Sequence, residues 1–107
     1  MSCLLLLISA TSARAEISAS EAIRLFESGD TQASAYLNGI ETGLGWANAS
    51  LIADNKPALF CVPEKIALTV HQQVDVMKKF IRSSPEFATR TAGQTMLFAF
   101  QEAFPCR

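Results

Sequence analysis

Helix-start motifs recur along this sequence, and they constrain its fold more than any other feature. The segments Ser18-Ala19-Ser20-Glu21, Thr69-Val70-His71-Gln72 and Thr91-Ala92-Gly93-Gln94 each place a hydroxyl residue three positions before Glu or Gln. In such a capping box, the hydroxyl and the longer polar side chain each satisfy a free backbone amide at a helix start. Strand signals are almost lacking between the motifs, so we predict an all-α domain.

Apolar spacing and helix-stop residues divide the chain into four predicted helices. The first covers about 19–28, and its narrow apolar stripe predicts loose docking. The third opens at Thr69 and stops at 83–85, and after a short turn the fourth carries apolar residues as far as Phe104. The second runs from Asp30 or Thr31 to about Ala53 and is expected to bury one continuous face, made of Ala33, Leu37, Ile40, Leu44, Ala47 and Leu51.

The second predicted helix contains Gly39, Gly43 and Gly45, where alanine would stabilise a helix by up to about 1 kcal/mol each. Gly39 and Gly43 lie one turn apart, near Tyr36 and Trp46, so close approach of another backbone would explain them. We favour tight packing of helices within the domain as the interpretation. Contact with a partner or a second subunit is the alternative.

The first fifteen residues have the pattern of an export signal. The apolar run Leu4–Ile8 leads to Ala13-Arg14-Ala15, which fits the A-x-A cleavage pattern. Since no Lys or Arg precedes that run, the signal is weak or the true start lies upstream; a buried N-terminal helix is the alternative. We expect residues 1–15 to be a signal peptide and 16–107 to be one periplasmic domain that begins at Glu16.

Cysteine usage fits this expectation. Removal of Cys3 with the signal leaves Cys61 and Cys106 as a pair in a small exported domain. We therefore expect a disulfide that ties the C-terminus to the loop before the third helix. Two free thiols in a cytosolic protein are the alternative, whereas two Cys and one His do not complete a tetrahedral metal site, and no cofactor is expected.

Charge and composition disfavour several classes of function. Nine Lys and Arg face ten Asp and Glu, without a basic cluster, which disfavours binding of nucleic acid or anionic membranes. The longest apolar run has five residues, far fewer than the roughly 20 that span a bilayer. His71 is the only histidine and has no free cysteine nucleophile beside it, and the spacing of Glu64 and Asp75 does not predict a shared site. We therefore expect a non-enzyme.

Several motifs resemble the Rap/Tai type of type VI secretion immunity proteins. The resemblance covers about three quarters of the chain, 33–107, and departs from many relatives because no further Cys precedes the Tyr-Leu-x-Gly segment. Any second crosslink of the family is therefore absent here. The motifs that carry the resemblance are Phe60-Cys61-Val62-Pro63, Gln73-Val74-Asp75-Val76, Ser84-Pro85-Glu86 and Ala103-Phe104-Pro105-Cys106, with Tyr36–Gly43 as a further similar stretch.

The resemblance implies a small periplasmic helical protein that binds a peptidoglycan amidase effector and plugs its active-site cleft. The effector would be delivered by a neighbouring cell, and such immunity proteins are often dimers. A rival function from another class is a periplasmic acid-stress chaperone, which unfolds at low pH to expose apolar surface. The ten carboxylates and the single expected disulfide are compatible with that rival.

Two surface segments are candidate partner contacts. Loops on a helical scaffold commonly carry recognition, and the loop 55–66 would be stiffened by the disulfide. The turn 83–90 between the third and fourth helices is the second candidate, and a solvated connector is the alternative for the loop. The sequence does not rank the two. Their candidate side chains are Asp54, Lys56, Glu64 and Lys65 for the loop, and Glu86 and Arg90 for the turn.

Overall fold

The structure, a computed structural model, describes residues 16–107, so the predicted signal peptide lies outside the described residues. Within 16–107 the chain forms four α-helices and no strand. This confirms the predicted all-α class and helix number. The elements are α1 (Ala19–Glu27), α2 (Thr31–Ala53), α3 (Val70–Ser83), the 3-10 helix η2 (Pro85–Thr89) and α4 (Ala92–Ala103).

The helix starts use the predicted hydroxyl caps, but only α3 has a complete capping box. Its Thr69 hydroxyl accepts from the Gln72 amide, and the Gln72 side chain accepts from the Thr69 amide at 3.0 Å. Ser18 caps α1, whereas the Glu21 carboxylate turns to Arg24 and accepts from its guanidinium at 2.6 and 3.1 Å. This hydrogen bond from Arg24 lowers the pKa of Glu21.

The first helix is firmly docked, so the prediction of loose docking is wrong. Ala19 and Ala22 are completely buried, because their small side chains let the α1 backbone approach the rest of the domain closely. Two backbone hydrogen bonds join the start of α1 to the start of α4: the Ala19 amide donates to the Arg90 carbonyl at 2.8 Å and the Ala92 amide to the Ile17 carbonyl at 2.9 Å. The prediction of loose docking considered only large apolar residues, so it missed both the buried alanines and these backbone hydrogen bonds.

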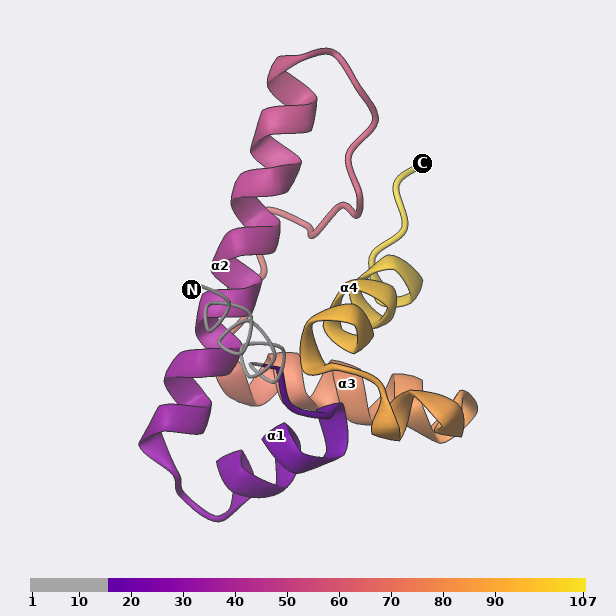
Figure 1. Cartoon of the computed structure of the whole chain (residues 1–107). Coiled ribbons are helices and arrows are strands. Elements are labelled where there is room, and N and C mark those ends of the chain that lie inside the picture. The colour runs from indigo at the N-terminus through magenta and orange to yellow at the C-terminus, as the bar shows by residue number, and fades with distance from the viewer. Residues whose placement is uncertain (1–15) are drawn as a thin grey trace, which may run out of the picture.

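The core lies where α1, α3 and α4 meet the first half of α2 (Figure 1). α3 and α4 make the most extensive of these contacts. Two polar side chains lie within the core: Gln73 donates to the Leu68 carbonyl at 3.0 Å, and Thr95 donates to the Phe87 carbonyl at 3.1 Å. The completely buried large apolar side chains are Leu37, Met77, Met96 and Phe100.

The second helix does not bury the whole of its predicted face. Ala33 and Leu37 are buried, Ile40, Leu44 and Leu51 are half-buried, and Ala47 is exposed. Figure 1 shows the reason: the second half of α2 extends beyond α1, α3 and α4, and only the connecting segment after it lies alongside. The apolar residues of α2 therefore recur along its whole length, but the other helices pack only against its first half.

Candidate protein-binding surfaces

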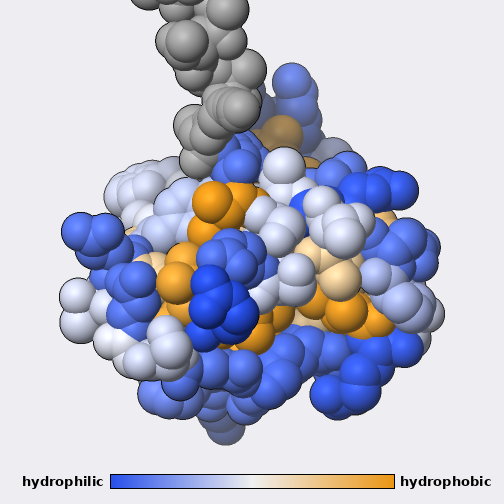
Figure 2. Space-filling model, turned by 60° about the horizontal axis from the view of Figure 1, so that its bottom comes forward, coloured by the Kyte–Doolittle hydropathy of each residue, from blue (hydrophilic) through white to orange (hydrophobic). Residues whose placement is uncertain are grey.

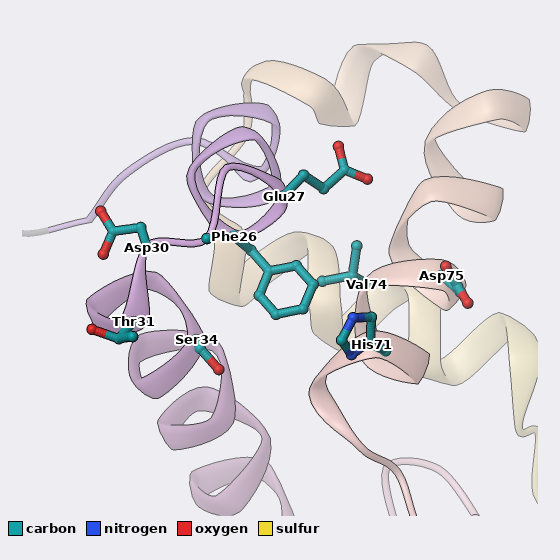
Figure 3. A pocket seen from close by; sticks show the side chains of 9 residues that line it. Phe26, Glu27, Asp30, Thr31, Ser34, His71, Val74 and Asp75 are labelled. Atoms are coloured by element: carbon teal, nitrogen blue, oxygen red, sulfur yellow. The ribbon is translucent and has the colours of Figure 1, made fainter.

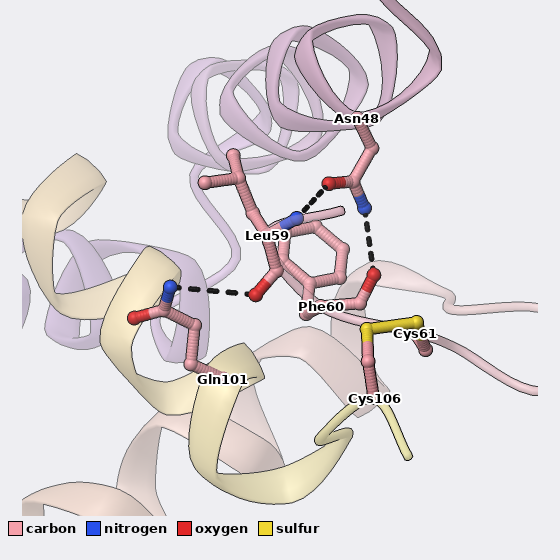
Figure 4. Close-up of a disulfide and its surroundings, with 6 residues drawn as sticks. All are labelled: Asn48, Leu59, Phe60, Cys61, Gln101 and Cys106. Carbon is pink, nitrogen blue, oxygen red and sulfur yellow. Dashed lines mark hydrogen bonds between the residues drawn. A yellow bond between two sulfur atoms is a disulfide. The ribbon is translucent and has the colours of Figure 1, made fainter. Parts of the chain in front are cut away.

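The connecting segment 54–69 is fixed to the helices at several points. Asn48 of α2 holds it with both ends of its side-chain amide: Oδ1 accepts from the Leu59 amide at 2.6 Å, and Nδ2 donates to the Phe60 carbonyl at 2.9 Å (Figure 4). Gln101 of α4 donates to the Leu59 carbonyl at 3.3 Å from the other side. Two helices therefore position the same short stretch of backbone.

The disulfide adds a covalent tie at the end of this stretch. Cys61 and Cys106 are bonded, as predicted, and the Cys61 amide donates to the Phe104 carbonyl at 2.8 Å. Phe60 is 6% exposed and packs edge-on against Phe100 at a centroid distance of 5.3 Å. The segment is therefore anchored by a buried aromatic ring, hydrogen bonds and a disulfide.

The predicted loop residues lie on this anchored segment. Asn55 ends α2 in the left-handed conformation (φ 59°), and the Lys56 amide donates back to the Leu51 carbonyl at 2.8 Å. This end fixes where the chain leaves the helix. The charged side chains that the segment then presents to solvent are Asp54, Lys56, Glu64 and Lys65, all of which are exposed.

The second candidate turn lies elsewhere on the molecule. Glu86 and Arg90 are exposed on or beside η2, and the Arg90 guanidinium lies over the Phe87 ring at 4.8 Å from its centroid. In Figure 1, the 54–69 segment is at the top, whereas 83–90 follows the right-hand end of α3. The structure therefore does not bring the two groups of predicted residues into one surface.

The single histidine lies in a hollow of about 560 Å³ between α1, the start of α2 and the start of α3 (Figure 3). His71 packs edge-on against Phe26, with ring centroids 5.0 Å apart. The Asp30 carboxylate is used to cap α2, and Glu27 pairs with Lys78 at 2.6 Å. Figure 3 shows these carboxylates directed away from the His71 ring, and Asp75, which also lines the hollow, forms no ion pair with His71. The hollow therefore does not assemble an acid–base pair.

The outer surface of α2 exposes two large apolar side chains among small and polar residues. Trp46 is 73% exposed and Ile52 is 59% exposed, and Glu41 is the one charged residue of this helix. A Cβ at Gly39, Gly43 or Gly45 would meet no heavy atom within 4 Å other than those of the adjacent residues and the backbone of its own helix. The interpretation of these glycines as close intradomain contacts is therefore wrong, and the alternative, contact with another molecule, remains a prediction.

A scan against family models matches the Rap1a immunity proteins over residues 14–106. That range covers nearly the whole chain and includes the disulfide, the anchored segment and all four helices. The chain belongs to the Rap1a immunity protein family. No curated protein and no solved structure matches significantly.

Membership of the Rap1a family indicates a role in immunity to a type VI secretion effector and binding of a protein partner. Within residues 16–107, no group of three His, Cys, Asp or Glu side chains could hold a metal ion. No helix in this range is long and apolar enough to cross a membrane.

Sequence reasoning missed the residues that hold the loop. Asn48 belongs to an Asn-Ala-Ser glycosylation pattern, which we treat as coincidental in the sequence, and Gln101 has no motif of its own. One signal could have identified Asn48: it is an amide side chain on the inner side of α2, among mainly apolar neighbours. Such a group requires hydrogen-bond partners when another segment covers it.

Proposed function

We propose that the mature chain acts in the periplasm as an immunity protein that binds and blocks a peptidoglycan amidase effector of a type VI secretion system. The proposal assigns the chain a binding role, not an enzymatic one. One observation carries it: the exposed charges of the 54–69 segment flank a stretch of backbone, residues 59–61, that Asn48, Gln101 and the disulfide hold in place. A preorganised surface loses less entropy on binding than a free loop does.

Within this proposal, Lys56 and Lys65 contact the effector, with Asp54 and Glu64 on the same segment. The test is calorimetry at pH 7 against candidate peptidoglycan amidase effectors. We expect selective binding that is lost in the Lys56→Glu, Lys65→Glu double variant. The Glu86→Lys, Arg90→Glu variant, which leaves the net charge unchanged, tests the second candidate turn separately, and loss of binding in it would add that turn to the contact.

The acid-stress chaperone alternative predicts different behaviour in the same preparation. Circular dichroism and light scattering of an aggregating client protein at pH 3 would report acid unfolding and client protection. Absence of amidase binding together with acid-triggered protection would contradict the immunity proposal. The Rap1a family match supports immunity over this alternative.

Export and cleavage form part of the proposal. The intact mass of the protein recovered from the periplasm should correspond to a chain that begins at Glu16. A soluble cytosolic protein that retains residues 1–15 would contradict it.

A homodimer is the second partner that we propose, with the outer face of α2 as its contact. Helical periodicity places Trp46 on the side of α2 opposite Asn48, so a second copy would leave the 54–69 segment free. Sedimentation of wild type and Trp46→Ala tests this, because loss of this large exposed ring should favour the monomer. A monomeric wild type at micromolar concentration would refute the dimer.

A further inference from the structure

A shallow apolar hollow of about 510 Å³ lies between α1, α3 and η2, beside the 83–90 turn and separate from the 54–69 segment. Ile23, which is 7% exposed, forms its floor together with the half-buried Ile81 and Ala88. Figure 2 shows the side of the molecule to which α1 and α3 contribute, where apolar surface in orange is interrupted and bordered by hydrophilic residues in blue. The volume is within the range of about 300–1,000 Å³ in which protein sites bind ligand groups.

Cations are concentrated around this hollow. Residues 16–107 contain eight Lys and Arg, and three of them, Arg24, Lys78 and Arg82, line it. Within the chain, Arg24 pairs with Glu21 and Lys78 pairs with Glu27, both at 2.6 Å. Arg82 forms no ion pair or side-chain hydrogen bond with any residue in 16–107. The hollow therefore offers one available guanidinium beside an isoleucine floor.

These features define the chemistry of the group that fits. An apolar side chain would cover Ile23 and Ile81, and a carboxylate near it would reach the guanidinium of Arg82. Arg binds carboxylates in a bidentate way, and removal of water from the apolar floor strengthens the pair. A second anion would meet no available cation, since Glu21 and Glu27 already neutralise the other two.

We propose that this α1–α3 hollow binds an acidic segment of the effector, in which a large apolar side chain stands next to a carboxylate. The inference rests on the proposed function for the identity of the partner. It adds a second contact on the effector, distinct from the Lys56 and Lys65 segment. Charge complementarity to Arg82 selects an acidic segment over a basic one.

The test compares Arg82→Glu with Lys79→Glu in calorimetry with a peptidoglycan amidase that wild type binds. Lys79 is a matched control, because it is an exposed cation of the same helix that lines a different hollow, beside Glu102. We expect Arg82→Glu to weaken effector binding tenfold or more and Lys79→Glu to weaken it less than twofold. Circular dichroism melts of both variants verify that each is folded.

A second measurement examines the hollow without the effector. Methyl NMR of the mature protein is titrated with sodium decanoate, which joins a carboxylate to an apolar chain, and with decyltrimethylammonium as the control of opposite charge. Decanoate should shift the methyl signals of Ile23 and Ile81 saturably in wild type and not in Arg82→Glu. Equal shifts with both amphiphiles, or no shift, would overturn the assignment.

The outcomes separate this inference from the proposed function. If wild type binds the amidase and Arg82→Glu binds equally well, the hollow is not an effector contact, although immunity stands. If Arg82→Glu changes self-association instead, the hollow accepts a second copy and the inference is wrong. If wild type binds no amidase, both the proposed function and the effector as occupant fail, whatever decanoate shows.

Discussion

Loss of the Cys61–Cys106 disulfide should destabilise the domain, and the length of the loop that the bond closes sets the size of the effect. The bond joins residues 45 positions apart in sequence, and it closes a loop that contains α3, η2 and α4. In the chain-entropy model, closing a loop of this length restricts the unfolded chain by about 4 kcal/mol at 25 °C. Because small domains have about 5–15 kcal/mol in total, the reduced protein should be only marginally folded.

The effect should act mainly through the unfolded state. In the native state, the Cys61 amide still has the Phe104 carbonyl, and Phe60 still packs on Phe100 when the sulfur atoms are separated. The native fold should therefore survive in a Cys61→Ser, Cys106→Ser variant under mild conditions. Its unfolding free energy should fall by about 4 kcal/mol.

Urea unfolding followed by far-UV circular dichroism measures this change, with and without reductant. The reductant should lower the stability of wild type and leave the double serine variant unchanged, which controls for side effects. A loss below about 1 kcal/mol in both experiments would refute the loop-entropy reasoning. It would mean that the unfolded chain is already restricted by other contacts.

Five further substitutions test other parts of the structure. Asn48→Ala should cost about 1–3 kcal/mol in urea unfolding and speed amide hydrogen exchange in 57–61, because the Leu59 amide and the Phe60 carbonyl lose their partner; unchanged exchange would contradict this. Phe100→Ala, which removes a completely buried ring, should cost about 3–5 kcal/mol. Gly29→Ala should lower the free energy of unfolding by about 1 kcal/mol, because φ at this position is +92°. Gly39→Ala should raise the unfolding free energy of the monomer by up to about 1 kcal/mol in the same assay, because the space around Gly39 is open. The lowered pKa of Glu21 means that its contribution is present above its unfolded pKa and is lost as pH falls through its folded pKa. Wild type and Glu21→Gln should therefore differ in melting temperature at pH 7 and converge at pH 2.

Local sequence signals determined where the helices begin and end. Hydroxyl caps act within one turn, so Ser18, Thr69 and Thr91 could be placed without knowledge of the rest of the chain, and the cap of α2 was narrowed to Asp30 or Thr31, of which Asp30 is the one used. The left-handed Gly29 is equally local. The pairing of Cys61 with Cys106 followed from counting, because the predicted cleavage of the signal would remove Cys3 and leave a single possible pair.

The tertiary structure decided which apolar faces are covered. The apolar period of α2 continues past Leu37, but the other helices cover the first half alone, and no pattern within α2 records where its neighbours end. The docking of α1 likewise depends on Ala19 and Ala22, whose small side chains become informative once the α4 start lies beside them.

The same distinction applies to the candidate sites. Charged residues of the 54–69 segment and the 83–90 turn were visible in the sequence, but their separation in space was not. The hollow beside Arg82 joins residues 23, 81 and 88 from three elements, so it exists only after α1 packs against α3 and η2. Capping acts over one helical turn and can be read locally, whereas burial and site geometry depend on contacts between distant segments, which only the folded chain brings together.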